Sequence, residues 1–502
     1  MKKNILTALR VHKFYILDML LFAVYLYIGL NLLPLHEPWS DEIQPWLMAR
    51  DMSFSDLAKA MYHNYDRHPG LWYFIMHGIS LLGFTIEGAS YANFIFCATA
   101  IGLILFKAPF ARPFKYAFMF SYYMLYEYPI LARHYSLTLL LMVIIACLYA
   151  SRFKRPVLFG AVIFLLFNSA YITLGFTFTL FAVYLWELSR QEKISSAQWL
   201  GIALMTAGFM LVFIQGGILP PNHVDYQNPR SAKYIQETWF LTRTLFPQPG
   251  QLSPAWDTFI TLALTAVALL SLIRSPLCLM ILCGGYAMLI YIFKFHHWGD
   301  LRHYGFFIHI LLFTFWIKHN YQEIDWKFLK WVPCRICGKI TLFTLGACFL
   351  AGTSFTQTII KLEQKSLFSG GKFMASQITQ MYDHFKLYDK DITIVAHPHT
   401  RAVAVINYLP RVKFWVPGSK EYATYFLNTK EMKDASEISQ EEVLRELEAN
   451  FTDLSKVFLL LAKPLEINET KIAKYVLLVD MTNMPVHGYV QEKFYLYKPI
   501  KK

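Results

Sequence analysis

Long apolar runs separated by short polar stretches make up most of the chain before residue 360. They cover residues 16–33, 90–106, 116–131, 136–151, 157–187, 197–216, 256–273, 277–295, 303–318 and 340–358. A helix needs about 17 to 25 apolar residues to cross the hydrocarbon core of a bilayer, and most of these runs approach or reach that length. The pattern therefore predicts a polytopic α-helical membrane protein.

Two runs leave the number of crossings open, because 71–84 is short and 157–187 is long enough for two helices broken near Asn168 and Ser169. Basic residues tend to stay on the inner side of a membrane. If 71–84 only dips into the bilayer and 157–187 crosses twice, every basic cluster between the runs lies inside. We therefore predict about eleven spans, with the N-terminus inside and the C-terminus outside.

From about residue 360 the pattern changes to that of a soluble α/β domain. Strand-like runs at 391–396, 412–416, 456–462 and 474–480 alternate with helical patterns at 402–408 and 440–449. None of the seven cysteines lies in this part, so no disulfide is expected there. We predict two domains: 1–359, with an outer loop over 36–70 that carries helices next to the membrane, and an extracytoplasmic α/β domain over 360–502.

The composition excludes several other classes of protein. The chain is 56% hydrophobic and only 16% charged, with a mean hydropathy of +0.35, which is too apolar for an ordinary soluble or disordered protein. Its net charge is +13, and the part before residue 360, with 27 basic and 17 acidic residues, carries +10 of it. Because the basic residues are scattered between apolar runs, we interpret the charge as membrane topology and expect no nucleic-acid partner.

Candidate chemistry gathers in the polar segments that this topology places on the outer face: 36–70, 127–135, 217–255 and 296–304. In the first of them, Asp41 follows the first span closely, so its carboxylate is expected at the depth of the lipid headgroups. A structural interpretation is that Asp41 caps a helix, with Gln44 three positions later as its partner. A second helix is predicted to begin near Ser53. Capping and catalysis by Asp41 are compatible, and spacing alone does not separate them.

The same outer segment ends in a group of titratable residues, Asp66, Arg67 and His68, directly before the aromatic pair Trp72 and Tyr73. An aromatic belt at headgroup depth explains the tryptophan and the tyrosine as well as a substrate site does. It explains the three titratable residues less well. We therefore predict that they contribute to substrate binding.

Three short motifs occur at defined places relative to the predicted spans. They are Trp39-Ser40-Asp41-Glu42 after the first span, His68-Pro69-Gly70-Leu71-Trp72-Tyr73, and Ala132-Arg133-His134-Tyr135-Ser136-Leu137 at the start of a later span. Together they resemble the GT-C superfamily of membrane glycosyltransferases, most of all its protein O-mannosyltransferase-like and lipid A aminoarabinose transferase-like branches. The likeness covers about residues 10 to 150 by motif and the remainder by architecture. The family more often has two prolines where this chain has Pro69-Gly70, and glycine leaves the backbone freer there.

The resemblance implies an enzyme that takes a sugar from a polyprenyl-phosphate or polyprenyl-diphosphate carrier and transfers it to an acceptor on the outer face. Such a transfer needs a base for the acceptor proton, cations for the departing phosphate, and exclusion of water. Asp41 matches the family's acidic base position. Glu42 could bind the acceptor or, in a metal-using branch, help to hold a cation. The branches that this chain most resembles work without a metal, so we predict no metal and no cofactor.

The cations for the lipid phosphate are predicted at two other outer junctions. Arg133 and Arg302 are the candidates, because a guanidinium can donate two parallel hydrogen bonds to a phosphate. Their neighbours at these junctions complete the predicted substrate-binding residues: Glu127, His134, Tyr135, Asp300 and His303. The alternative for each arginine is a side chain that reaches toward lipid headgroups. Arg230, Lys233 and Arg243 in the 217–255 loop could guide an anionic substrate, or simply be solvated.

These observations favour a glycosyltransferase that uses a polyprenyl-phosphate-linked sugar donor and a lipid, glycan or protein acceptor. A transporter would show ionisable residues in the middle of spans and an internal repeat, and the pattern shows charges at span ends instead. A non-enzymatic receptor or envelope assembly protein would account for the tail but not for the outer charges. The cysteine-free outer domain and the resemblance favour a bacterial inner membrane, with a cytoplasmic N-terminus and a periplasmic C-terminal domain. Cys334 and Cys337 are interpreted as incidental thiols in preference to a metal site.

Overall fold

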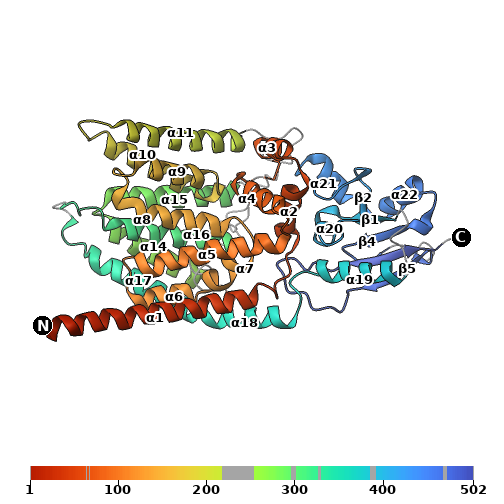
Figure 1. The fold of residues 1–502 in the computed structure, drawn as a ribbon, viewed down its shortest axis with the longest axis horizontal. Coiled ribbons are helices and arrows are strands. Elements are labelled where there is room, and N and C mark those ends of the chain that lie inside the picture. Colours follow the sequence, from red (N-terminus) through yellow and green to blue (C-terminus); the bar gives the residue numbers. More distant parts are fainter. Residues whose placement is uncertain are drawn as a thin grey trace. The chain divides into compact units, whose positions relative to one another are not determined.

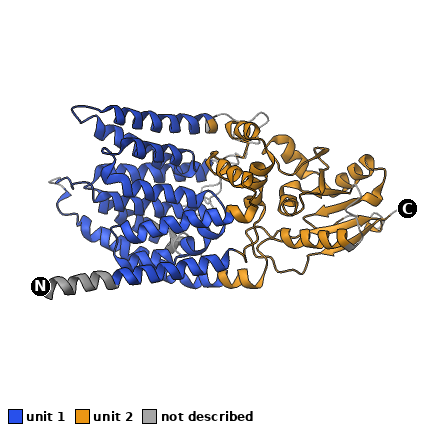
Figure 2. Cartoon of the chain, in the orientation of Figure 1, with its two compact units in different colours: residues 1–33, 90–214, 226–359 blue, residues 34–89, 215–225, 360–502 orange. Residues whose placement is uncertain are grey.

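The computed structural model describes residues 2–500 except 64, 67, 218–253, 296–300, 326–328, 385–391 and 467–471. The chain is mostly helical (Figure 1) and divides into two compact units (Figure 2). Unit 1 consists of residues 1–33, 90–214 and 226–359, and unit 2 of residues 34–89, 215–225 and 360–502. Residues 34–81, which include the predicted outer loop and are called the outer segment below, therefore belong to the same unit as the C-terminal sheet. The predicted boundaries had grouped them with the apolar helices.

Unit 1 is built from helices. In chain order they are α1 (Lys2–Leu32), α5 (Ile86–Lys107), α6 (Arg112–Met119), the π-helix η1 (Tyr123–Glu127), α7 (Tyr128–Ile130), α8 (Tyr135–Leu148), η2 (Tyr149–Ser151), α9 (Pro156–Phe167), η3 (Tyr171–Thr173), α10 (Leu174–Leu188), α11 (Ser196–Gly217), α14 (Pro254–Leu272), α15 (Pro276–Phe295), α16 (Leu301–Lys318), α17 (Cys334–Ala351) and α18 (Thr353–Lys365). The ends of α5, α11 and α18 extend into unit 2.

Among the described residues, six helical segments are long and apolar enough to cross a membrane: Phe14–Leu32, Ile86–Lys107, Tyr171–Leu188, Ser196–Gln215, Pro276–Phe295 and Cys334–Lys365. Shorter apolar helices occupy Leu71–Leu81, Tyr135–Ser151, Pro156–Phe167 and Leu262–Leu272. This pattern is compatible with an integral membrane protein. The count of eleven spans stays a prediction.

The long apolar run 157–187 is broken, as expected, near Asn168 and Ser169. Helix α9 ends at Phe167, a turn follows, and α10 runs from Leu174 to Leu188. Helices α9 and α11 approach each other closely at Gly160 and Gly201. A side chain on Gly160 would collide with the Cα of Gly201. The predicted run 71–84 forms only the 11-residue helix α4 (Leu71–Leu81), about 16 Å long and shorter than the hydrocarbon core.

The predicted span 116–131 is irregular. Helix α6 ends at Met119, and a π-helical turn then carries the chain from Tyr123 to Glu127 before the short helix α7. A π-turn widens the helix and frees backbone groups, so such turns often mark functional sites. Here the side-chain amide of Asn93, on α5, donates hydrogen bonds to the carbonyl groups of Tyr128 and Leu131 at 2.7 and 3.0 Å. This fully buried asparagine fixes the chain just before α8 begins.

Unit 2 combines three helices of the outer segment with an α/β domain. The outer helices are α2 (Ser40–Asp51), α3 (Phe54–Tyr62) and α4. The domain holds the helices α19 (Gly371–His384), α20 (His399–Ile406), α21 (Lys430–Glu437), α22 (Gln440–Asn450) and η5 (Leu454–Lys456), and the strands β1 (Thr393–His397), β2 (Lys413–Val416), β3 (Glu421–Tyr422), β4 (Val457–Leu461), β5 (Tyr475–Asp480) and β6 (Tyr495–Pro499).

The six strands form one mixed sheet in the order β3-β2-β1-β4-β6-β5. β1 pairs in parallel with both β2 and β4, so that Thr393 lies opposite Lys413 and Val457. The remaining pairs are antiparallel. The four predicted strands and both predicted helices of this domain are confirmed. The elements β3, β6, α19 and α21 were not predicted from the sequence.

The sheet is buried on both faces at its centre. Val395 and Leu459 pack against Val443 and Leu447 of α22 on one face, and α20 packs against β1. The neighbouring residue Ile394 is also fully buried, so β1 and β4 read as continuous apolar runs, typical of parallel strands that are covered on both sides. Helix α2 packs in turn against α20 and α4, which joins the outer segment to the sheet domain within unit 2.

Candidate functional site

The predicted base, Asp41, is the second residue of α2 and is partly exposed. The capping interpretation placed it before the helix with Gln44 as its partner, and that interpretation is wrong. Helix α2 begins at Ser40, and the backbone N–H of Trp39 donates instead to the Glu42 carboxylate, at 3.4 Å. The side chain of Gln44 bonds to the backbone of Phe426. The contact of Gln44 could not be read from local spacing, because Phe426 follows it by 382 residues.

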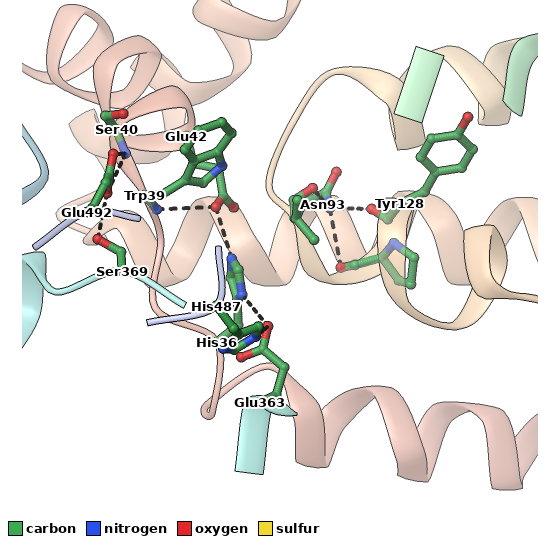
Figure 3. A network of polar contacts seen from close by, with 12 residues as sticks. His36, Trp39, Ser40, Glu42, Asn93, Tyr128, Glu363, Ser369, His487 and Glu492 are labelled. Carbon is green, nitrogen blue, oxygen red and sulfur yellow. Dashed lines mark hydrogen bonds and ion pairs between the residues drawn. The ribbon is translucent and has the colours of Figure 1, made fainter. Parts of the chain in front are cut away.

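Glu42 is buried and forms an ion pair with His36. Its Oε2 lies 2.9 Å from Nε2 of His36, whose Nδ1 lies 2.9 Å from Oε1 of Glu363 on α18 (Figure 3). Burial alone lowers the pKa of His36, but the two carboxylates outweigh it and raise that pKa to about 10. His36 is therefore an imidazolium held between two carboxylates. A further histidine, His487, lies 3.8 Å from the same oxygen of Glu363.

Glu37 stands beside this triad of His36, Glu42 and Glu363, with one carboxylate oxygen buried. Burial raises the pKa of its carboxyl to about 7, against the lowering influence of Lys372 and His36. A carboxyl group with a pKa near neutrality can both accept and release a proton under physiological conditions. The sequence analysis did not select Glu37, because its surroundings come from residues that are distant in the chain.

A further buried carboxylate, that of Glu492, lies at the start of α2. Its oxygens accept hydrogen bonds from the backbone N–H of Ser40 at 3.1 Å and from the hydroxyl of Ser369 at 2.6 Å (Figure 3). Arg401 of α20 lies 3.8 Å away. Burial raises the pKa of Glu492, while these donors and the arginine act in the opposite direction. No sequence spacing links Ser40 to Glu492, which follows it by 452 residues.

The predicted substrate residue Asp66 also contacts the sheet domain. Its carboxylate accepts hydrogen bonds from the Tyr73 hydroxyl and, at 3.0 Å, from the side-chain amide of Asn428. The backbone N–H of Asn428 donates to the carbonyl of Tyr65 at 3.0 Å. His68 is partly buried just before α4. Arg67 lies outside the described residues.

The predicted phosphate-binding residues belong to unit 1, where two junctions distant in sequence meet. The hydroxyl of Tyr128 donates to the carbonyl of Arg302 at 2.8 Å, and the hydroxyl of Tyr135 is hydrogen-bonded to Nε2 of His303 at 2.8 Å. These bonds join the α7–α8 connection to the start of α16. The sequence analysis placed both junctions on the outer face, and the structure brings them together.

The charged side chains at these two junctions are buried. Arg133 and Arg302 are 5% and 7% exposed, and Glu127 is 1% exposed and accepts a hydrogen bond of 2.5 Å from the Tyr122 hydroxyl. His134 is buried as well, with its ring centre 4.2 Å from that of Tyr135. Asp300 lies outside the described residues. So do Arg230, Lys233 and Arg243 of the 217–255 loop.

In the part of the chain that the structure describes, no group of three or more His, Cys, Asp or Glu side chains is placed to hold a metal ion. Cys334 and Cys337 are buried free cysteines. Each unit thus offers its own chemistry. The outer segment of unit 2 presents carboxyl groups that can take up a proton, and the junctions of unit 1 present guanidinium groups that can hold an anion.

Comparison of this chain with protein-family models, with curated proteins and with solved structures finds no match.

Proposed function

We propose that this protein is a membrane glycosyltransferase, which moves a sugar from a polyprenyl-phosphate carrier to a glycolipid, polysaccharide or protein acceptor on the outer face of the membrane. The observation that carries the proposal is the meeting of the α7–α8 connection with the start of α16. Two segments that are far apart in sequence are joined there by hydrogen bonds, and each carries a buried arginine, Arg133 or Arg302. Burying arginine is costly, and an anionic group is the ligand that such side chains suit best.

In the proposed reaction the acceptor oxygen attacks the anomeric carbon of the donor sugar. The bond between that carbon and the phosphate oxygen breaks, and the oxygen leaves with the bonding electrons. Arg133 and Arg302 stabilise the negative charge on the departing polyprenyl phosphate. Attack from the side opposite to the leaving group inverts the configuration of the sugar.

Asp41 is proposed as the general base that takes the proton from the attacking acceptor hydroxyl. It lies in the first turn of α2 and is partly exposed, whereas its neighbour Glu42 is buried in an ion pair with His36. We therefore assign proton transfer to Asp41, and to Glu42 the task of holding the chain before α2 in place.

The test uses purified protein in lipid with a panel of polyprenyl-phosphate sugars and a bacterial lipid extract as the source of acceptors. We expect donor consumption by the wild type and a loss of about 10²- to 10⁴-fold in turnover for Asp41→Asn, the usual contribution of a general base. The matched control is Asp434→Asn, at an exposed position of α21 in the same unit, with turnover like that of the wild type. Full turnover of Asp41→Asn would overturn the assignment of the base, and no donor consumption by the wild type would overturn the function.

The arginines are tested in the same assay by substitution with lysine, which keeps the charge but loses the planar fork. Arg302→Lys is expected to lower kcat/KM about tenfold to hundredfold. Arg335→Lys, at an exposed position of α17, is the control and should leave the activity unchanged.

Transport is a second candidate function, and one observation favours it. His309, in the middle of α16, is 3% exposed, and neither of its ring nitrogens has a hydrogen-bond partner among the described residues. It lines a cavity whose other walls are apolar and aromatic, including Phe118 and Trp316. Ionisable side chains inside apolar helices often mark transport pathways. In sealed proteoliposomes a transporter would move the labelled sugar donor across the bilayer chemically unchanged, whereas a transferase would consume it.

A further inference from the structure

Glu492 lies where two helices of unit 2 begin. Its carboxylate accepts the backbone N–H of Ser40, the first residue of α2, and the hydroxyl of Ser369 (Figure 3). That same hydroxyl oxygen accepts the backbone N–H of Gly371, the first residue of α19, at 3.2 Å. The backbone carbonyl of Glu492 accepts the N–H of Gly370 at 2.9 Å. One residue near the C-terminus of the chain therefore ties together the starts of α2 and α19.

A helix start needs such partners. The first N–H groups of a helix have no acceptor within the helix, and their partial positive charge attracts an anion. In α2 the residue before the helix is Trp39, whose side chain has no acceptor atom. Glu492 supplies the missing acceptor from the other end of the chain. Its side chain is fully buried, so the bonds that it makes are shielded from competing water.

The residue held in this way is the immediate neighbour of Asp41. A shift of Ser40 relative to the sheet domain would move the first turn of α2 and with it the Asp41 carboxylate. Two other side chains near the start of α2 are also held in place: Glu42 by His36, and Gln44 by the backbone of Phe426. The start of α2 is thus anchored at several points, and Glu492 is the one that holds the backbone of the residue directly before Asp41.

We propose that Glu492 is a positioning residue for Asp41, through which the C-terminal domain fixes the first turn of α2. This proposal rests on the proposed function for the role of Asp41, and it extends that function by giving the C-terminal domain a part in the reaction. Glu492 touches no substrate in this scheme. It acts only through the backbone of Ser40.

The test compares Glu492→Ala with Glu492→Gln and with Glu448→Ala, a control at an exposed position of α22 in the same unit. Alanine removes both hydrogen bonds, whereas glutamine keeps an acceptor for the Ser40 N–H and a partner for the Ser369 hydroxyl. We expect Glu492→Ala to lower kcat about tenfold to hundredfold, the usual cost of a misplaced catalytic group, with little change in KM for the donor. Glu492→Gln should recover most of that loss, and Glu448→Ala should behave like the wild type.

Hydrogen exchange measured by mass spectrometry on the full-length protein gives a readout that does not depend on activity. For peptides covering residues 36–47, Glu492→Ala should exchange about tenfold faster than the wild type, while Glu492→Gln and Glu448→Ala should not. Ser369→Ala, which removes one of the two bonds, serves as the milder variant if Glu492→Ala does not fold, and should give a smaller increase.

The two kinds of failure are distinguishable. Unchanged exchange in Glu492→Ala, or in Ser369→Ala where that variant is used, would overturn the positioning role whatever the activity. So would a loss of activity in Glu492→Gln as large as that in Glu492→Ala without faster exchange. A wild type that consumes no donor would overturn the proposed function alone, and the exchange of residues 36–47 would then still decide whether Glu492 fixes the first turn of α2.

Discussion

Two groups of buried polar residues, one in each unit, are held in different ways. In unit 2 the described contacts are mainly ionic, with the His36 imidazolium between Glu42 and Glu363, and Glu492 beside Arg401. In unit 1 the described contacts at the α7–α8 connection and the start of α16 come from tyrosine hydroxyls, such as that of Tyr135. A buried ion pair depends on the charge of both partners, whereas a phenol hydrogen bond persists as long as the phenol stays protonated.

The two groups should therefore be sensitive to different changes. The unit 2 network should respond strongly to the loss of one charge and to pH, because removing one partner leaves the other charge buried. The unit 1 junctions should respond weakly to the loss of the Tyr128 or Tyr135 hydroxyl, because each contributes one hydrogen bond, to a backbone carbonyl or to an imidazole nitrogen. Substitutions that remove one group at a time can test both expectations.

The largest effect is expected from Glu363→Ala in unit 2. The substitution takes one of the two carboxylates away from the buried His36 imidazolium, and breaking such a pair costs about 3 kcal/mol of unfolding free energy. Thermal unfolding of the purified protein in detergent should show this as a clear drop in melting temperature. The control is Glu448→Ala, whose ion pair with Lys474 is exposed and worth less than about 1 kcal/mol. Equal melting temperatures for the two variants would contradict the ionic description of unit 2.

The next effect is a pH dependence that His36 gives to unit 2. Its pKa is about 10 in the folded protein and about 6.5 when unfolded. The folded state therefore binds the proton more tightly, so the stabilisation is complete below pH 6.5 and is lost as the pH rises toward 10. The groups that raise the pKa of His36 are the carboxylates of Glu42 and Glu363, and His487 lies 3.8 Å from the same oxygen of Glu363.

Melting temperatures of the wild type and of His36→Gln, measured from pH 6 to 10, test this dependence. The wild type should lose stability over that range, by at most a few kcal/mol, and His36→Gln should start lower and change less. His319→Gln, at an exposed position, should follow the wild type. A variant curve parallel to that of the wild type would mean that His36 is not the source of the slope.

The sequence predicted local structure in both units well, and for a physical reason. Apolar runs such as 157–187 determine where helices form and break, and short continuous apolar runs near 393–397 and 457–461 mark strands. Arg133 and Arg302 were both predicted as phosphate-binding residues, because both stand at the ends of apolar runs. Apolar runs and their ends are local features, which can be read from each segment without knowing its tertiary contacts.

The partners of the unit 2 network could not be predicted in this way. His36 meets Glu363 across 327 residues, and Ser40 meets Glu492 across 452. Neither Glu363 nor Glu492 belongs to a motif, and nothing in their local sequence distinguishes them from exposed glutamates. Only the fold buries their carboxylates. The same holds for the capping of α2, where local spacing favoured Asp41 with Gln44. In the structure Glu492 of the sheet domain accepts the first N–H of α2 instead, since tertiary contacts override local preference.

The smallest effect is expected at the junctions of unit 1. Tyr135→Phe removes the hydroxyl that is hydrogen-bonded to His303 but keeps the aromatic ring, so the unfolding free energy should fall by only about 1 kcal/mol. Tyr27→Phe, at a position of α1 that is 70% exposed, is the control and should have no effect. Because the ring of His303 orients the start of α16 against α8, Tyr135→Phe should also raise KM for the lipid donor more than it lowers kcat. If Tyr135→Phe destabilised the protein as much as Glu363→Ala, the contrast between the ionic network of unit 2 and the neutral bonds of unit 1 would fail.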